Sequence, residues 1–325
     1  MNTKDKVAAA LGARPGLFVS GEELAAECGV SRAAVWKAIT SLREAGYGIE
    51  AKTNAGYRLA GDVLDASRIA AALDGALAAR VRITALGEVD STNTVAREHA
   101  ASGEAEGLVV CAASQSAGRG RMGRSFFSPR DAGLYMSVLL RPAASAAIST
   151  EITTAAAVAV CRAIGAVLGI DAGIKWVNDV FVGGKKVCGI LTEAALSVET
   201  GTLDYAVLGI GINVYEPDGG FPPELADIAG ALVVGERRPG LKNVLAAAVI
   251  SEFFALYDRL GSHPQIDEYR RRSIVLGRRV TATSLAGAPE REGTVEAITD
   301  DAALVLRFDD GSRETLTSGE IRVKI

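Results

Sequence analysis

The apolar pattern of this chain changes twice along its length, which limits the folds open to it. Residues 1–61 show a helical period, residues 63–272 mix apolar strands with helices, and residues 273–325 alternate in short runs. A chain of 325 residues exceeds one small domain, so these changes predict three domains with those boundaries. The composition, 49% hydrophobic and 23% charged, indicates neither disorder nor a fibrous repeat.

The first 61 residues have the spacing of a helix-turn-helix. The stretch "SGEELAAECGVSRAAVWKAITSLREAG" predicts a helix, a turn at Gly29 and Val30, an N-cap at Ser31 and a second helix that ends near Gly46. The stretch "IEAKTNAGYRLAG" predicts a β-hairpin that follows as a wing. Helical spacing predicts that one face of the second helix packs on the core, through Ala34, Val35, Ala38, Ile39 and Leu42.

The opposite face of that helix carries side chains that suit DNA. A helix in the major groove places such side chains against base edges and phosphates. With the N-cap, this candidate DNA face comprises Ser31, Arg32, Ala33, Trp36, Lys37, Thr40 and Arg43. Residues 1–61 contain 8 Lys and Arg against 6 Asp and Glu, a charge of +2, so with −4 for the whole chain the remainder carries −6. We expect a DNA-binding domain; a helical hairpin that serves only for docking is the alternative.

Residues 63–272 predict an α+β domain around a mixed sheet, because strands and helices do not alternate strictly. We expect strands in "GLVVCAASQ", "GLYMSVLLRP" and "DYAVLGIGINV", and helices from Thr153 to Leu168 and in "LKNVLAAAVISEFFALYDRL". Ser91 to Asn93 should lie at a strand-to-helix junction. The apolar run from Ala155 is interrupted by Arg162, and the N-terminal residues do not resemble a signal peptide, so we expect a cytoplasmic protein without a membrane contact.

Residues 273–325 predict a small β-barrel, from runs such as "RRVTAT", "REGTVEAI" and "ALVLRF". They contain no evident catalytic residue, so we expect a packing or docking module. The four cysteines are far apart in apolar surroundings, which predicts buried thiols at Cys28, Cys111, Cys161 and Cys188. His99 and His263, the two histidines, lie near no Cys or Ser signature, which disfavours Ser/His/Asp catalysis and a His-rich metal site.

The stretch "QSAGRGRMGR", residues 115–124, contains the glycine spacing of dinucleotide-binding folds. Such a fold needs a helix next, whereas "RSFFSPRDAGLY" predicts a loop, and no GK[ST] follows as in a Walker motif. What remains is a flexible loop whose glycines admit a ligand close to the backbone and whose arginines bind carboxylate or phosphate. Two unit charges about 4 Å apart repel by about 4 kcal/mol at a dielectric near 20. The arginines could offset this repulsion, so the loop could bring two anions together.

Two more clusters each leave two interpretations open. Lys185 and Lys186, in "GGKKVCGILTE", could supply another cation to the same anions or form a solvated hairpin turn. Asn178 and Asp179, in "IKWVNDV", could form a plain turn. Alternatively, Asp179 could hold Mg²⁺ or its waters while Asn178 meets a phosphate or ribose.

The motifs "DSTN", "QSAGRGRMGR", "KWVND", "KKVCGIL" and "GIGINV", in this order, resemble those of the biotin protein ligases over essentially the whole chain. The helix-turn-helix resembles the bifunctional class, in which the ligase also represses the biotin operon. The resemblance implies a class II synthetase-like central domain and an SH3-like C-terminal barrel. It also implies that biotin and MgATP form biotinyl-5′-AMP and that a lysine of a biotin carboxyl carrier domain then receives biotin. Operator DNA and, once adenylate is bound, a second copy of the chain are the other implied partners.

The resemblance assigns roles to individual residues. The biotin positions are Ser91, Thr92, Asn93, Gln115, Arg119, Gly120, Arg121, Lys186, Gly189 and Gly211. The ATP and adenylate positions are Arg124, Phe126, Lys175, Asn178, Asp179 and Asn213, with Asp179 also the candidate Mg²⁺ ligand. Arg121 and Lys186 are the expected catalytic residues.

The chain departs from the family pattern at three positions. Val177 stands where many relatives have proline, Met122 replaces a frequent arginine, and Phe126 replaces a familiar tryptophan. Two other functions fit part of the pattern. A lipoate protein ligase would lack this helix-turn-helix and this arginine-glycine loop. A transcription regulator with a degenerate ligand domain would bind DNA without modifying a carrier.

Overall fold

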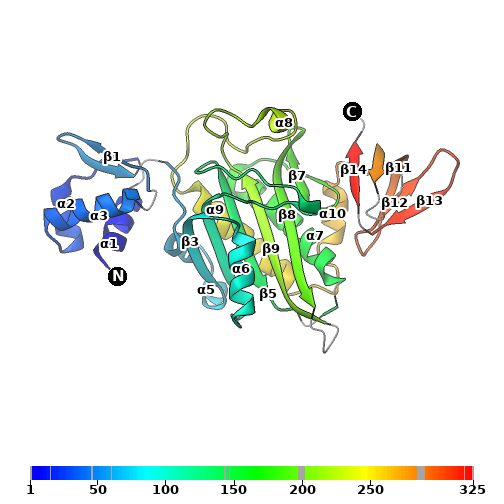
Figure 1. The fold of residues 1–325 in the computed structure, drawn as a ribbon, viewed down its shortest axis with the longest axis horizontal. Coiled ribbons are helices and arrows are strands. Elements are labelled where there is room, and N and C mark those ends of the chain that lie inside the picture. Colours follow the sequence, from blue (N-terminus) through cyan, green and yellow to red (C-terminus); the bar gives the residue numbers. More distant parts are fainter. Residues whose placement is uncertain are drawn as a thin grey trace.

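The chain is arranged along one axis in the computed structural model, with a small helical domain at one end, a large sheet in the middle and a small sheet at the other end (Figure 1). The structure describes residues 2–14, 16–44, 47–59, 61–142, 144–145, 147–196, 202–283, 290–317 and 319–323.

The N-terminal domain is a helix-turn-helix followed by a two-stranded wing, as predicted. Its elements are α1 (Thr3–Gly12), α2 (Gly21–Cys28), α3 (Arg32–Glu44), β1 (Ile49–Lys52) and β2 (Gly56–Leu59). Ser20 and Glu23 form a capping box at the start of α2, and Gly29, with φ 66°, ends that helix in the left-handed region. Ser31 Oγ accepts the Ala34 N–H at 3.2 Å, which is the predicted N-cap of α3. The expected helix end near Gly46 lies outside the described residues.

This domain has a hydrophobic core of its own. Val35, Ile39 and Leu42 on α3 are each 1% exposed and pack against Leu24 of α2. Ala34 was predicted to join them, but it is only half-buried, because it lies at the edge of the apolar stripe.

A mixed sheet of seven strands forms the central domain, in agreement with the expected α+β architecture. Its order is β3-β4-β5-β9-β8-β7-β6, in which β3 and β4 are parallel and the other neighbours pair antiparallel. The strands are β3 (Arg82–Val89), β4 (Leu108–Gln115), β5 (Gly133–Leu140), β6 (Gly173–Lys175), β7 (Asp179–Val182), β8 (Lys185–Leu196) and β9 (Leu203–Asn213).

Helices cover both faces of this sheet, because its central strands are apolar on both sides. On β4, Leu108 and Val110 pack under α6 (Thr92–Ala101), whereas Val109 and Cys111 belong to the core formed with α7 (Ile148–Leu168) and α9 (Leu241–Tyr257). The remaining helices are α4 (Ala66–Ala71), α5 (Gly75–Arg80), α8 (Pro223–Ala226) and α10 (Ile266–Arg272).

Helix α7 corrects one expectation. It begins five residues before the predicted Thr153, and by length and composition it could cross a membrane despite Arg162. However, 67% of its most apolar window is buried inside the protein, where α7 packs on α9 and the sheet. Its apolar character is therefore explained by its place in the core. All four cysteines are free and buried as expected, and burial raises the pKa of the Cys111 and Cys161 thiols to about 12.

Five short strands form the C-terminal antiparallel sheet, in the order β13-β12-β11-β10-β14. They are β10 (Arg279–Thr283), β11 (Arg291–Ile298), β12 (Leu304–Arg307), β13 (Arg313–Leu316) and β14 (Glu320–Val323). Trp176 of the central domain donates its indole N–H to Ala302 O at 2.8 Å, and Val295 and Leu306 share the hydrophobic core of the central domain. This sheet therefore packs firmly on its neighbour.

The separate core of the N-terminal domain leads to a prediction. Replacing Ile39 with Ala should remove about 2–5 kcal/mol of stability, enough to unfold a domain of this size. Hydrogen exchange read by mass spectrometry should then show fast exchange in residues 2–59 and unchanged exchange in the central sheet. Trp36→Ala is the matched control, because Trp36 lies on the same helix but is 61% exposed. Faster exchange across the whole chain would contradict an independent core.

Candidate functional site

The sequence "GIGIN" at the end of β9 places glycine on one face of the sheet and isoleucine on the other. Gly209 and Gly211 share the face of Val207, which packs under α6, whereas Ile210 and Ile212 belong to the core beneath. Gly189 on β8 pairs directly with Gly211. The sheet therefore has a bare patch of backbone on the α6 side, which can serve as the floor of a pocket.

Phe126 lies against this floor. A Cβ atom on Gly211 would come within 2.5 Å of the Phe126 ring, and one on Gly189 within 3.1 Å. Tyr135, which pairs with Gly211 from β5, meets the ring edge-on at 6.4 Å between centroids. Glycine at both positions is therefore what allows an aromatic ring to lie on the sheet.

The arginine-glycine stretch is a tight loop, as predicted, and not the start of a long helix. Phe126 N donates to Gly118 O at 2.8 Å, and Gly120 N donates to Arg124 O at 2.7 Å. Met122 at the tip has φ 57°, an unfavourable left-handed conformation for a residue with a side chain, and it is 54% exposed. The loop thus holds its arginines above the floor and presents Met122 to solvent.

Loop and floor enclose a cavity of about 130 Å³. The predicted residues that line it are Ser91, Thr92, Asn93, Gln115, Arg119, Gly120, Arg121, Arg124, Phe126, Lys175, Asn178, Asp179, Lys186, Gly189 and Gly211. Asn213, at the end of β9, is not among the lining residues. Lining residues to which no role was assigned are Met122, Ser125, Trp176, Ile190, Leu191, Gly209, Ile210, Gly319 and Ile321.

A polar cluster forms one end of the cavity. Thr92 donates to Gln115 Oε1 from its backbone N at 2.9 Å and from Oγ1 at 3.1 Å, and Gln115 Nε2 donates to Ser128 Oγ at 2.8 Å. Ser137 Oγ, fully buried on β5, lies 2.7 Å from Thr92 Oγ1 and 2.6 Å from Asn93 Oδ1. These contacts fix the orientation of each donor and acceptor before any ligand arrives.

Glu193 joins this cluster to the loop, and the sequence analysis missed it. Its carboxylate accepts from Asn93 Nδ2 at 2.7 Å and lies 3.5 Å from guanidinium nitrogens of both Arg97 and Arg119. The sequence feature that could have identified Glu193 is its place on β8. It is in phase with Gly189 and Leu191, so it lies on the same face of the sheet as the pocket. Glu193 thereby ties Arg119 to the sheet.

Cations gather at the other end. Lys186 Nζ lies 2.7 Å from Asp179 Oδ1, and Arg121 donates to Asn178 Oδ1 at 3.1 Å. Asn178 is itself held by β8, because its Nδ2 donates to Ile190 O at 2.9 Å. Two fixed-charge groups on neighbouring elements can therefore meet two anions that would otherwise repel each other.

The two adjacent lysines have different surroundings. Lys186 lines the cavity, whereas Lys185 Nζ donates to the carbonyl oxygens of Ala226 and Asp227, at 3.1 and 2.7 Å, outside it. The structure thus separates the two side chains, and the supply of a cation by Lys186 stays a prediction. Val177, at the family's proline position, follows a cis peptide bond after Trp176.

The C-terminal sheet also reaches the cavity, through Gly319 and Ile321. The segment therefore packs beside the cavity, and its expected role as a packing or docking module stays a prediction. The alternation of short strands could not reveal this contact with the cavity, because it depends on how the two sheets are packed together.

The candidate DNA face of α3 points outward, with Thr40 half-buried. Trp36 is 61% exposed, and Lys37 is exposed beside it. Arg43 is committed to the wing, because its guanidinium donates twice to Ile49 O at 2.9 and 2.8 Å. Arg32 forms an exposed ion pair with Glu22 at 2.8 Å.

Comparison with family models finds three matches along the chain. The Biotin/lipoate A/B protein ligase family matches residues 86–213. An HTH domain matches residues 6–58, and the Biotin protein ligase C terminal domain matches residues 275–323.

Individual proteins are similar over much longer stretches. The Bifunctional ligase/repressor BirA of Bacillus subtilis (strain 168) is 33% identical over 309 residues, 91% of each chain. The protein of the same name from Escherichia coli (strain K12) is 33% identical over 320 residues, 95% of this chain and 94% of that one. The solved Biotin protein ligase from Aquifex aeolicus in complex with biotin and ATP has a TM-score of 0.62 at 26% identity and covers 75% of this chain and 98% of its own.

The bare floor leads to a prediction for Gly209. A Cβ at this position would lie 2.3 Å from Asn93 Oδ1, so Gly209→Ala should displace Asn93 and break its contacts with Ser137 and Glu193. We expect a loss of about 1–3 kcal/mol in the free energy of unfolding, measured by denaturant titration. Gly165→Ala on α7 is the control, because its nearest neighbour is 3.8 Å away and the change should stabilise the helix. Equal effects of the two variants would contradict the packing described.

Proposed function

We infer, from the premise that this chain belongs to the biotin protein ligase family, that it is an ATP-dependent biotin protein ligase. It forms biotinyl-5′-AMP and transfers biotin to a lysine of a biotin carboxyl carrier domain. Its helix-turn-helix supports a second role as a biotin-responsive repressor, the role named in its bifunctional relatives. One observation carries the ligase function: a single cavity joins a fixed polar cluster, a glycine floor and a wall of cations.

We propose that the biotin ring lies at the polar end. Ser91, Thr92, Asn93 and Gln115 present neighbouring hydroxyl and amide groups there, which suits the ureido group with its carbonyl oxygen and two N–H groups. If the Phe126 ring moves off Gly189 and Gly211, these glycines would let the aliphatic chain lie along the backbone toward Arg119, Gly120 and Lys186. The biotin carboxylate would then reach the cationic end.

The nucleotide would occupy the opposite side of the cavity. Arg124, Lys175, Asn178 and Asp179 line it there and could hold phosphates and ribose, and Asn213 would contribute from the end of β9. Phe126 offers a ring face for adenine, and in this structure its ring lies on the glycine floor.

In the first step, a carboxylate oxygen of biotin attacks the α-phosphorus of ATP and pyrophosphate leaves. The two anions repel by about 4 kcal/mol at 4 Å in a medium of dielectric near 20, and Arg121 with Lys186 would supply the opposing charge. The carboxylate is already a nucleophile, so no general base is required and alignment governs the rate. In the second step, the carrier lysine amine attacks the biotinyl carbonyl carbon and AMP leaves.

The loop of residues 116–127 would act as a lid. A mixed anhydride hydrolyses readily, and a loop that closes over it excludes water until the carrier lysine arrives. The loop is already anchored to the sheet through the ion pair of Arg119 with Glu193.

Magnesium fits the site through one residue. Among the described residues, no group of three or more His, Cys, Asp or Glu side chains is placed to hold a metal. Mg²⁺ with a nucleotide needs only one or two carboxylates, since phosphates and water complete its shell. Asp179 Oδ1 is buried, and its close partner among the described residues is the Lys186 ammonium at 2.7 Å, so Asp179 is the residue that would hold the ion if Lys186 turned to the phosphates. The ion would neutralise phosphate charge.

The remaining features of the proposal concern assembly. Bound adenylate would favour a homodimer, whose paired α3 helices would contact the two halves of an operator. The C-terminal sheet would close into an SH3-like barrel beside the cavity. A cytoplasmic location is part of the same proposal.

Carrier modification tests the ligase function directly. Purified protein, MgATP, biotin and an acceptor carrier domain should give a carrier heavier by one biotinyl group on one lysine, read by mass spectrometry. Lipoate in place of biotin is the parallel arm. Modification with lipoate alone would overturn the assignment in favour of lipoate transfer, and no modification with either would favour a regulator without ligase activity.

The adjacent lysines provide a matched pair for the first step. Lys186→Gln should slow biotinyl-5′-AMP formation about 10²–10³-fold, the usual loss when one group that stabilises transition-state charge is removed. Lys185→Gln should stay near wild type, because Lys185 binds loop carbonyls outside the cavity. Single-turnover formation of adenylate with the carrier omitted is the measurement. Similar rates in the two variants would remove Lys186 from the mechanism.

A further inference from the structure

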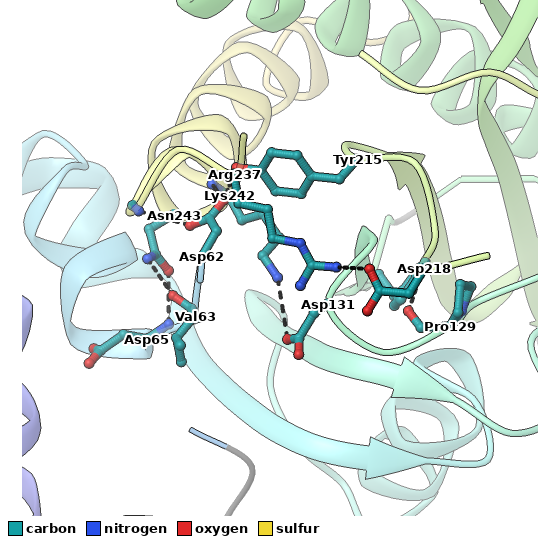
Figure 2. A network of polar contacts seen from close by, with 12 residues as sticks. Asp62, Val63, Asp65, Pro129, Asp131, Tyr215, Asp218, Arg237, Lys242 and Asn243 are labelled. Atoms are coloured by element: carbon teal, nitrogen blue, oxygen red, sulfur yellow. Dashed lines mark hydrogen bonds and ion pairs between the residues drawn. The ribbon is translucent and has the colours of Figure 1, made fainter. Parts of the chain in front are cut away.

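The segment between the DNA-binding and central domains is fixed in place. Asp62, only 2% exposed, accepts three hydrogen bonds, from Gly240 N at 2.8 Å, Lys242 N at 2.7 Å and Tyr215 OH at 2.8 Å (Figure 2). Gly240 and Lys242 lie at the start of α9, so the orphan N–H groups of that helix are what bind the carboxylate.

Asn243 holds the next residues of the same segment. Its Oδ1 accepts from Asp65 N at 2.8 Å, and its Nδ2 donates to Val63 O at 2.7 Å (Figure 2). With the bonds to Asp62, five hydrogen bonds join residues 62–65 to α9 and Tyr215. The direction in which the chain leaves toward the DNA-binding domain is therefore set by the central domain.

A buried amine lies at the centre of this arrangement. The Lys242 side chain has no exposure, and its Nζ makes no hydrogen bond within the described part of the chain. Its nearest carboxylate is Asp131, at 4.0 Å. Burial lowers the pKa of Lys242 and raises that of Asp62, while each charge opposes the shift of the other. An amine with incomplete partners in such a place is costly, and neither step of the ligase reaction uses it.

Asp131, beside this amine, and Tyr215, which bonds Asp62, both lead toward the cavity. Asp131, with φ 64°, follows Phe126 by five residues, just beyond the loop that covers the floor. Tyr215 follows the floor residue Gly211 by four residues, and its N donates to Ala132 O at 2.7 Å. A shift of the loop or of the end of β9 therefore acts on the groups that surround Lys242.

We propose that Lys242 and Asp62 couple occupancy of the cavity to the orientation of the DNA-binding domain. The proposal rests on the proposed function for the identity of the ligands, biotin and ATP. When the loop moves onto a ligand, the distance from Asp131 to the Lys242 ammonium changes. The electrostatic potential at Asp62 then changes too, and with it the strength of the hydrogen bonds by which Asp62 fixes the segment. Such coupling acts in both directions, so the position of the DNA-binding domain also biases the loop.

Distances between two spin labels test the coupling. Thr53→Cys in the wing and Glu98→Cys on α6 introduce exposed attachment points, whereas the four natural cysteines are buried. Pulsed electron paramagnetic resonance, with and without biotin and MgATP, should show a shifted or narrowed distance distribution in the wild-type background. Lys242→Met should lose that ligand response while it still biotinylates a carrier domain.

Asp131→Asn is the second variant, because it removes the charge that faces Lys242 without altering the buried side chain. It should also lose the response. Asp218→Asn is the matched control: its carboxylate is 96% exposed, pairs with Arg237 at the rim of the same network and should leave the response intact (Figure 2). The proposal would be overturned if the wild-type distance distribution did not change on addition of both ligands. It would also be overturned if the distributions of the two variants changed as that of the wild type does. Absence of carrier biotinylation would count against the ligase function instead, and the distances would still decide the coupling.

Discussion

Electrostatic repulsion between a carboxylate and a phosphate is the constraint on which the site depends. A flat apolar sheet could not bring the two groups together, because their repulsion grows when they leave water for a medium of lower dielectric. The central domain places a cation on each of two sides of the cavity, Arg121 from the loop and Lys186 from β8. Each is already oriented by a polar neighbour, Asn178 or Asp179, so little reorganisation is needed when charge develops.

The same strands provide both the stability of the domain and the shape of the site. On β9, isoleucines fill the core on one side while glycines leave the floor open on the other. In the proposed binding mode, the most regular part of the sheet, and not an irregular loop, would therefore carry the ligand. Rigid strands hold the floor, and the movement proposed for the lid would be confined to the loop above it.

Much of this could be predicted from the sequence, because the informative residues are neighbours in the chain. The arginine-glycine loop and the "KWVND" turn each lie within about a dozen residues, and the helix-turn-helix occupies one continuous stretch, residues 20–46, so their chemistry can be inferred from the local sequence. Ser137 and Glu193 were missed for a physical reason: each is a single polar residue in a long strand, and only the register of β5, β8 and β9 shows that both lie on the face of the sheet that carries Gly209 and Gly211. Gly319 and Ile321 depend on the packing of two domains, which no local pattern records.

The most direct test of the central claim follows the attacking oxygen. Biotin with both carboxylate oxygens replaced by ¹⁸O is turned over with MgATP and a carrier domain, and the products are analysed by mass spectrometry. Attack on the α-phosphorus, followed by attack of the lysine amine at the carbonyl carbon, leaves one ¹⁸O in AMP and one in the new amide. AMP without ¹⁸O, or ¹⁸O in pyrophosphate or phosphate, would contradict the account.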